Sequence, residues 1–262
     1  MSVITLLTDF GLDDTYVGQM KGAILAVAPA VTLVDLTHAV PAQDIHAGAF
    51  LLWSAVEPFP PGTTHLAVFD PGVGSVRRAV ALRSRRGDVF VGPDNGLLWP
   101  AVERLGGLVR AVELTEARFW RPAPSTTFHG RDLFGAVAGH VAQGVPLDQL
   151  GRPISDPQAA SVPVPRGHDG EVLHVDTYGN LITNLPAAGL PLEFEARVGA
   201  HRAPRATHYA AVAPGVLLAL IGSVGLLEIS ARDGSAAALT GARRGTPVHL
   251  VPLPASDGGN DA

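Results

Sequence analysis

Short apolar runs and longer segments with helical periodicity alternate through residues 3–143 of this chain. The runs predicted as strands are Val3 to Thr8, Thr32 to Leu36, Leu66 to Phe69, Ala79 to Arg83, Val89 to Val91 and Arg110 to Leu114. The segments predicted as helices are Tyr16 to Ala28, Gln43 to Val56, Leu97 to Leu105 and Arg131 to Gln143. Strands that alternate with helices are typical of βαβ units. Residues 1–154 are therefore predicted to form an α/β domain with a parallel-rich sheet and helices on both faces.

The pattern changes after this domain. Residues 155–169 are rich in proline and lack periodicity, so we predict a linker there. The strands predicted beyond it are Glu171 to Asp176, Leu181 to Asn184, Glu193 to Val198, Val216 to Ile221, Leu226 to Ser230 and Pro247 to Val251. These short runs, with no long helical segment among them, indicate a smaller all-β, barrel-like domain over residues 170–254. Residues 255–262 are predicted to be a disordered tail.

Composition narrows the classes of function. Apolar residues make up 47% of the 262 and charged residues 16%, as expected of a globular protein with a buried core. The net charge is −5 and no basic block occurs, which disfavours nucleic acid as a partner. The absence of cysteine excludes disulfides, thiolate metal sites and cysteine nucleophiles.

The start of the chain, MSVITLLTDFG, lacks the basic region of a signal peptide and is predicted to be a first strand. No apolar run approaches the ~20 residues that a membrane span needs. We therefore expect a soluble cytoplasmic protein with no membrane partner.

Polar residues follow three of the predicted strands. Asp9 follows the first, Asp70 opens a Pro-Gly turn after the third, and Asp94 with Asn95 lies in a turn before a helix. Because the carboxyl ends of parallel strands meet at one edge of a sheet, these side chains are predicted to share a cleft. Each of them taken alone is also typical of a helix cap or an Asx turn, and we interpret Asp14 as one of these two.

Two further side chains extend this candidate cluster. Arg77 lies across a glycine turn from Asp70, where a guanidinium and a carboxylate can together orient a small polar molecule such as water. His129 precedes a glycine and a predicted helix, where a histidine more often caps or packs than catalyses. In the β domain, residues 176–184 and 223–229 are typical of hairpin turns, although they also carry groups able to bind an amino acid or a base.

Several well-characterised motifs are absent from the chain. There is no Walker motif, no GxGxxG, no GxSxG, and no HxH or HExxH pair. ATP hydrolysis, dinucleotide chemistry and serine hydrolysis are therefore disfavoured, and a zinc site has no support.

Five short motifs in register carry a resemblance to a known family. They are Leu7-Thr8-Asp9-Phe10-Gly11, Asp70-Pro71-Gly72-Val73-Gly74-Ser75, Gly92-Pro93-Asp94-Asn95-Gly96, Phe128-His129-Gly130-Arg131-Asp132 and Asp176-Thr177-Tyr178-Gly179-Asn180. In this order and at these intervals, the set resembles the S-adenosylmethionine (SAM) hydroxide adenosyltransferases, or SAM hydrolases, which are related to the SAM-dependent fluorinase and chlorinase. The resemblance spans nearly the whole chain.

The resemblance implies a fold, an assembly and a reaction. The fold is an α/β domain followed by a β-barrel-like domain, and the assembly is a homotrimer with active sites between the N-terminal domain of one subunit and the C-terminal domain of the next. The reaction converts SAM and water to adenosine and L-methionine, without a metal or another cofactor. The family's catalytic triad falls on Asp70, Arg77 and His129. The residues that the resemblance places at the substrate are Asp9 at the ribose hydroxyls, Asp176 and Asn180 at the methionine end with Tyr178 beside them, Ser223, Glu228 and Ala231 at the amino acid or adenine, and also Asp14, Asn95 and Phe128.

Chemical reasoning favours water as the nucleophile at such a site. SAM already carries a sulfonium leaving group on C5′, so the protein must align a water and partly deprotonate it. An anionic Asp70 repels a halide, the halogenases carry no carboxylate there, and the fluorinase has serine where Gly130 stands. The chain also departs from its relatives, since Arg232 stands where they often have asparagine and Gln43 where the fluorinase uses an aromatic residue.

Three other functions remain as alternatives. A SAM-dependent halogenase is one. A calcium-dependent nucleoside hydrolase is another, because residues 7–14 partly match that family's DxDPGxDD motif, although Leu7 and Phe10 replace its first aspartate and its proline. The third is a non-catalytic sensor of SAM or adenosine.

Overall fold

The computed structural model describes residues 2–160 and 163–254. The chain divides into two compact units, residues 1–161 and 162–262, which are considered separately. The predicted linker, residues 155–169, is divided between the two units, and its limits stay a prediction. The predicted tail, residues 255–262, lies outside the described residues. Within the described part of the chain, no helix is long and apolar enough to cross a membrane.

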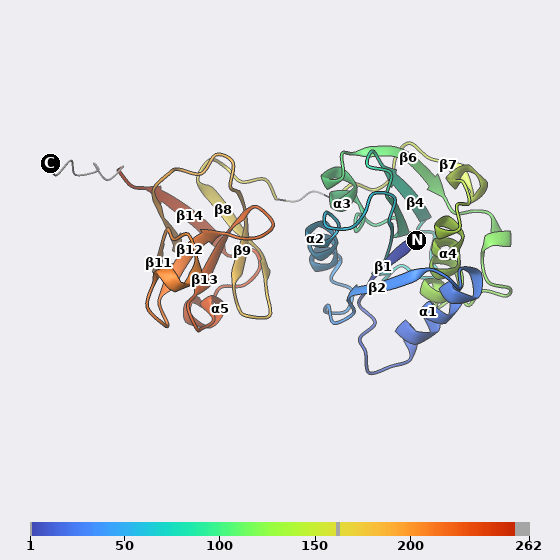
Figure 1. Cartoon of the computed structure of the whole chain (residues 1–262), viewed down its shortest axis with the longest axis horizontal. Helices are drawn as coiled ribbons and strands as arrows, with labels where there is room; N and C mark the ends of the chain where they lie inside the picture. Colours follow the sequence, from blue (N-terminus) through green and yellow to red (C-terminus); the bar gives the residue numbers. More distant parts are fainter. Residues whose placement is uncertain (1, 161–162, 255–262) are drawn as a thin grey trace. The chain divides into compact units, whose positions relative to one another are not determined.

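The first unit is built on a seven-stranded sheet (Figure 1). Its strands are β1 (Val3–Thr8), β2 (Thr32–Thr37), β3 (Thr64–Val68), β4 (Ala79–Ser84), β5 (Val89–Pro93), β6 (Leu108–Glu113) and β7 (Arg152–Pro153). They lie in the order β2-β1-β3-β5-β4-β6-β7. The pairs among β2, β1, β3 and β5 are parallel, whereas β5–β4, β4–β6 and β6–β7 are antiparallel. The predicted α/β architecture is confirmed, with a mixed sheet.

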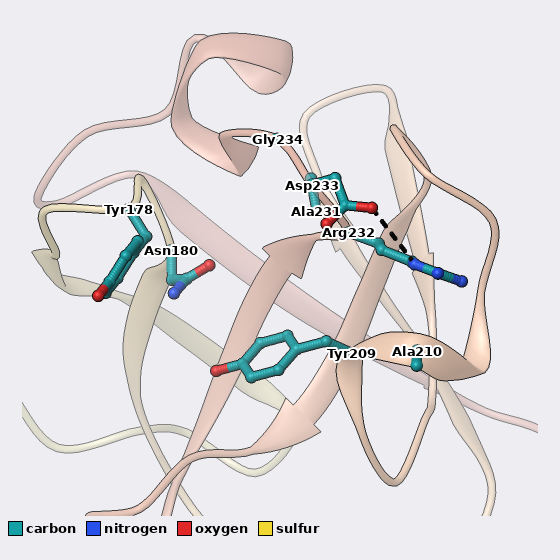
Figure 2. Close-up of a pocket in the computed structure, with 8 residues that line it drawn as sticks. All are labelled: Tyr178, Asn180, Tyr209, Ala210, Ala231, Arg232, Asp233 and Gly234. Atoms are coloured by element: carbon teal, nitrogen blue, oxygen red, sulfur yellow. Dashed lines mark ion pairs between the residues drawn. The ribbon is translucent and has the colours of Figure 1, made fainter.

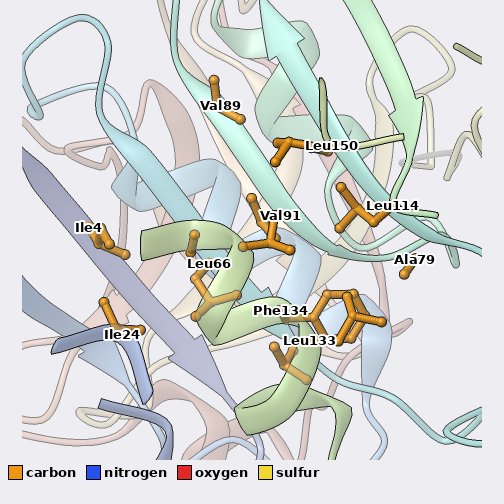
Figure 3. Close-up of a cluster of buried hydrophobic side chains, with 14 of the residues drawn as sticks. Ile4, Ile24, Leu66, Ala79, Val89, Val91, Leu114, Leu133, Phe134 and Leu150 are labelled. Atoms are coloured by element: carbon orange, nitrogen blue, oxygen red, sulfur yellow. The ribbon is translucent and has the colours of Figure 1, made fainter. Parts of the chain in front are cut away.

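Helices cover both faces of this sheet, as predicted. They are α1 (Tyr16–Val27), α2 (Ile45–Ala55), α3 (Trp99–Arg104), the π-helix η2 (Gly130–Gly135) and α4 (Ala136–Ala142), with short 3₁₀ turns at Ala117–Phe119 and Leu147–Gln149. Alternate strand residues point to opposite faces, so Ile4 and Leu6 pack with α1, η2 and α4, and Leu7 packs with α2 and α3. Figure 3 shows the first of these cores, with Phe134 of η2 at its edge.

The helix predicted over residues 131–143 differs from the observed one. Its first part, η2, is wound as a π-helix, and only the part from Ala136 onward is α-helical. Both parts carry apolar residues on the face toward the sheet, so the apolar pattern does not reveal the wider turn. Short π-helical segments are frequent at functional sites because they shift the side chains around them.

The second unit is a nearly closed antiparallel barrel, which confirms the predicted barrel-like domain. Its elements are β8 (Asp169–Val175), β9 (Leu181–Pro186), β10 (Phe194–Val198), β11 (His201–Pro204), a 3₁₀ turn η4 (Tyr209–Ala211), β12 (Leu217–Ile221), β13 (Leu226–Ala231), α5 (Ala236–Thr240) and β14 (Pro247–Pro252). The strand order is β11-β10-β14-β8-β9-β13-β12. A bridge between Arg205 and Ala219 brings the two ends of the sheet together. The sequence did not predict β11 or α5, because each has only four or five residues.

The topology of the first sheet explains how a site arises. β1, β3 and β5 are adjacent and parallel, so their carboxyl ends lie along one edge. Asp9 follows β1, Asp70 lies two residues beyond β3, and Asp94 follows β5. The predicted convergence of these strand ends is therefore present in the structure.

Candidate active site

The turn after β3 brings Arg77 back to Asp70. The Val73 amide donates to the carbonyl of Asp70 at 3.1 Å, and the Ser75 amide donates to the carbonyl of Gly72 at 3.0 Å, which gives two successive tight turns. Gly74, with φ of +75°, takes a left-handed conformation at which a Cβ would lie 2.9 Å from the Thr126 carbonyl. The glycines therefore let the chain double back beside the segment that leads to His129.

Arg77 joins Asp70 to His129. Its Nε donates to Asp70 Oδ1 at 2.8 Å and its Nη2 to Asp70 Oδ2 at 2.5 Å, a bidentate pair. The same Nη2 lies 2.7 Å from His129 Nδ1. The guanidinium also lies 5.0 Å above the ring of the buried Phe134, and the Asp70 side chain is only 7% exposed. Three side chains from two distant segments thus form one hydrogen-bonded row.

This row fixes the protonation of His129. An arginine has only donors, so Nδ1 of His129 must be the acceptor and the ring proton of the neutral imidazole lies on Nε2. Burial lowers the pKa of His129, and the positive charge of Arg77 lowers it further, while Asp70 and Asp132 act in the opposite direction. The imidazole is therefore neutral near pH 7.

A cleft of about 190 Å³ opens beside the row. Asp9, Asp70, Phe128 and His129, all named by the family resemblance, line it together with Gln43, which stands where the fluorinase has an aromatic residue. Gln43 has φ of 65°, and its amide donates to Asp9 Oδ2 at 2.7 Å. Burial raises the pKa of Asp9, and the nearby Asp70 carboxylate adds to that rise.

An aromatic cluster forms one wall of the cleft. Phe128 meets Phe10 edge-to-face at 5.7 Å between ring centroids and Tyr16 at 5.3 Å. Gly130 packs so tightly against this cluster that a Cβ there would lie 2.8 Å from Cζ of Phe10. This wall therefore has no room for a side chain at residue 130 unless Phe10 moves.

Two residues of the predicted rim, Asn95 and Asp94, and also Asp14, lie outside the cleft lining. Asn95 donates through Nδ2 to the Phe69 carbonyl at 2.8 Å and accepts from the Leu97 amide, so it supports the turn that carries Asp70 rather than lining the cleft. Asp94 is paired with Arg78. Asp14 is exposed, and α1 begins at Tyr16 with Thr15 at the N-cap position. Of the two roles predicted for Asp14, the helix cap is therefore wrong, because the loop after Gly11 continues one residue further.

Asp132 is a buried carboxylate that the sequence did not single out. It pairs with Arg131 at 2.6 Å and with Arg121 at 2.9 Å, and it accepts the Ser125 amide at 2.9 Å. The side chain is 2% exposed, and these partners, Arg131 first, lower the pKa of Asp132 to about 2. Asp132 thus fastens residues 121–127 beside η2, next to His129.

Asp132→Asn is expected to destabilise the folded state in a pH-dependent way. The folded pKa of about 2 lies below the ordinary 3.8, so the contribution of the carboxylate is present above pH 3.8 and is lost as the pH falls through about 2. A shift of this size corresponds to roughly 2 kcal/mol. Urea unfolding of both proteins at pH 7 and near pH 2.5 tests this, because the difference must shrink at acid pH. A difference that stays constant would contradict it.

The second unit has a larger pocket, of about 610 Å³, at one end of the barrel (Figure 2). Tyr178, Asn180 and Ala231, all predicted site residues, line it. Asp176 accepts the amides of Tyr178 and Asn180 at 2.9 Å and the Asn180 side-chain amide at 2.9 Å. Asp176 therefore shapes the turn that presents Tyr178, which is 78% exposed.

The opposite side of this pocket carries Tyr209, which the sequence analysis did not find. Its hydroxyl donates to Glu228 Oε1 at 2.7 Å, and the Ser230 hydroxyl donates to the same oxygen at 2.8 Å. Burial and the Glu228 carboxylate raise the pKa of Tyr209 to about 12. Glu228 thus lies beneath the pocket as a support, and Ser223 is exposed in the turn between β12 and β13, away from the lining residues.

Arg232 and Asp233 complete the lining of this pocket. Arg232 donates to the Val212 carbonyl at 2.8 Å and lies 3.5 Å from Asp233, as the dashed line in Figure 2 shows. Asp233 has φ of 52°, a left-handed conformation uncommon for residues other than glycine. Among the described residues, no group of three or more histidines or carboxylates is arranged to hold a metal ion.

Comparisons with known proteins agree with this arrangement. The SAM hydroxide adenosyltransferase N-terminal domain matches residues 4–151, and the C-terminal domain of the same family matches residues 170–249. An (R)-S-adenosyl-L-methionine hydrolase from Salinispora tropica is 41% identical over 257 residues, which cover 95% of this chain and 97% of that protein. One from Thermus thermophilus is 40% identical over 261 residues, covering 96% and 100%.

A solved structure is also similar over nearly the full length. An uncharacterized conserved protein from Thermotoga maritima aligns with a TM-score of 0.88 and 33% identity, over 95% of this chain and all of that one. The two matched domains follow the same order as the α/β unit and the barrel. The chain therefore belongs to the SAM hydroxide adenosyltransferase family.

Proposed function

We propose that this chain hydrolyses SAM to adenosine and L-methionine, by attack of a water molecule on C5′ in line with the C5′–S bond. The observation that carries the proposal is the row of Asp70, Arg77 and His129, whose two ends line a cleft together with Asp9. Family membership and the 40% identity to proteins named as SAM hydrolases support it.

The chemistry needs little from the protein beyond placing the water. The water oxygen forms a bond to C5′, the C5′–S bond breaks, and its electron pair stays on sulfur as the neutral thioether of methionine. The sulfonium leaves without protonation, so no general acid is required. One proton must leave the water, and holding the reactants in line can supply about 7–11 kcal/mol of the barrier in favourable cases.

Each member of the row has a part in this step. Arg77 holds the Asp70 carboxylate and the imidazole at fixed positions. His129 presents Nε2–H, because Nδ1 is occupied by Arg77, and so it orients the water as a donor. Asp70 retains free lone pairs and is the group able to accept the proton of the water.

The remaining residues would hold the substrate. Asp9 binds the ribose hydroxyls, Phe128 closes the cleft beside them, and Asn95 acts indirectly by fixing the Asp70 turn. Tyr178, Asn180, Ser223 and Ala231 are proposed at the amino acid or the adenine, with Asp176 and Glu228 supporting them, and Asp14 is proposed at the substrate without a more specific role.

A homotrimer would allow the two pockets to bind one SAM molecule together. The cleft of about 190 Å³ is smaller than the ~300–1,000 Å³ usual for small-molecule sites, so it holds only part of SAM. The pocket of about 610 Å³ on the barrel of an adjacent subunit would hold the rest. Light scattering on the pure protein tests this assembly, since a monomer would contradict it. The cytoplasmic location stays a prediction.

Water is a better nucleophile here than a halide. The fluorinase carries serine at the position of Gly130, where this chain has no space for a side chain against Phe10. The carboxylate of Asp70 would also repel an anion at C5′. Addition of chloride or fluoride to the reaction is therefore expected to give no 5′-halo-adenosine.

The decisive experiment incubates the pure protein with SAM and EDTA. Chromatography is expected to show adenosine and methionine in equal amounts, and mass spectrometry after reaction in ¹⁸O-water should place the label on the adenosine 5′-hydroxyl. Loss of activity in EDTA would favour the nucleoside hydrolase. Binding of SAM without turnover would favour a sensor, and label in any other position would contradict attack at C5′.

A further inference from the structure

Strand β1 carries two buried threonine–histidine pairs. Thr5 Oγ1 lies 2.7 Å from Nδ1 of His65, and Thr8 Oγ1 lies 2.8 Å from Nδ1 of His38. All four side chains are at most 2% exposed. Each histidine places Nε2 near a carboxylate without hydrogen-bond alignment, at 3.5 Å from Asp88 for His65 and 3.1 Å from Asp35 for His38.

The two pairs differ in what they hold. The Thr5 pair lies toward the start of β1, away from the cleft. The Thr8 pair is at its carboxyl end, directly before Asp9. Thr8 Oγ1 accepts the amide of Phe10 at 3.2 Å, and the carbonyl of His38 accepts the amide of Gly11 at 2.9 Å. The two residues after Asp9 are therefore held at two points, one at the Thr8 hydroxyl that pairs with His38 and one at the His38 carbonyl.

A carboxylate lies beside Nε2 of His38. Asp35 lies between the imidazole and the ammonium group of Lys21, 2.6 Å from the latter. The Thr8 hydroxyl can accept the Phe10 amide while donating its own proton to His38 Nδ1, which leaves the Nε2 proton of a neutral imidazole facing Asp35. The hydrogen bonds of Thr8 Oγ1 thus connect the imidazole of His38 to the backbone of the loop.

We propose that Thr8 and His38 are positioning residues that set the Asp9 carboxylate for the ribose diol. This inference rests on the proposed function, in which Asp9 receives the ribose hydroxyls. Neither side chain lines the cleft, so both act through the backbone of residues 9–11. Asp9 is held from the other side only by the amide of Gln43 among the contacts described, so loss of the Thr8 hydroxyl frees the loop to move.

A pair of Thr8 substitutions separates hydrogen bonding from packing. Thr8→Val keeps the volume and removes the hydroxyl, whereas Thr8→Ser keeps the hydroxyl and removes a methyl group. Thr8→Val is expected to bind adenosine roughly ten-fold more weakly, the loss of about one hydrogen bond, and to raise KM more than it lowers kcat. Thr8→Ser should stay near the wild type in both. Binding of 2′,3′-dideoxyadenosine should be equal in all three proteins.

Two controls complete the design. Thr5→Val removes the same bond from the pair that does not hold the loop, and should lower the melting temperature without changing adenosine affinity. In an Asp9→Asn background, Thr8→Val should have no further effect on the affinity for adenosine, because Thr8 is proposed to act through Asp9. Should Thr8→Val not fold, His38→Gln provides a second variant with the same expected selectivity for the diol.

The possible outcomes are distinct. Equal weakening of adenosine and its dideoxy analogue, a defect in Thr8→Ser rather than Thr8→Val, or additivity with Asp9→Asn would each overturn the inference. If the wild-type protein neither binds adenosine nor converts SAM, the proposed function itself fails. Normal turnover with no diol-selective defect would remove only the role of Thr8 and His38.

Discussion

Asp70→Asn is expected to lower kcat for SAM hydrolysis by roughly 10³-fold while SAM still binds, because a positioned proton acceptor contributes about 10²–10⁴ to such a step. The amide has nearly the same shape as the carboxylate, but it cannot take the proton of the water. It also leaves the Arg77 cation, whose side chain is 13% exposed, without its bidentate partner. Stopped assays for adenosine together with calorimetric binding of SAM measure both effects.

Asp88→Asn is the matched control for this prediction. Asp88 is also a buried carboxylate held by an arginine, with Arg86 donating through Nε at 2.8 Å and through Nη2 at 2.9 Å. It precedes β5 and so lies at the opposite edge of the sheet from Asp70. This variant should lose stability and keep its kcat. Equal activity losses in both variants would mean that Asp70 acts through folding alone, and full activity of Asp70→Asn would remove it from the mechanism.

The fold was predictable where local pattern and tertiary packing agree. Strands such as β1 and β3 are buried on both faces, so their sequences are mostly apolar, and the polar residues within them, such as Thr5 and His65, are buried as well. The two-residue β7 and the four-residue β11 carry too few residues for any period to be visible. The antiparallel placement of β4 between β5 and β6 depends on contacts across the sheet, which the order of elements along the chain does not encode.

The candidate site also has a part that was predictable from the sequence and a part that was not. Asp9 and Asp70 were predicted to meet because both follow strands predicted to be parallel, and the carboxyl ends of parallel strands lie at one edge of a sheet. The approach of His129 to Arg77 was implied by the family resemblance only, since 52 residues separate them. The resemblance pointed to the position of Gln43 but not to its backbone amide, which depends on a left-handed conformation, and Tyr209 projects from a 3₁₀ turn that has no sequence signal of its own.

The pH dependence of the reaction is expected to report on His129. Its pKa is lowered by burial and by Arg77, so the neutral form persists to a lower pH than for a free imidazole at 6.5. Protonation would place a proton on Nδ1, 2.7 Å from an arginine donor, and break the row. kcat/KM should therefore be level above pH 6.5 and fall about ten-fold per pH unit once the pH is below the lowered pKa.

His129→Asn tests the assignment, since the carboxamide oxygen still accepts from Arg77 but does not titrate. We expect its kcat/KM to be roughly 10²-fold lower at pH 7 and its acid limb to shift to the pH at which Asp9 protonates. His140→Asn is the control, because burial lowers the pKa of His140 as well, yet its ring packs on Phe119 rather than in the cleft. That variant should keep the wild-type profile. An unchanged acid limb in His129→Asn would mean that another group, with Asp9 foremost, controls the reaction at low pH. The imidazole would then orient the water without setting the pH dependence of the reaction.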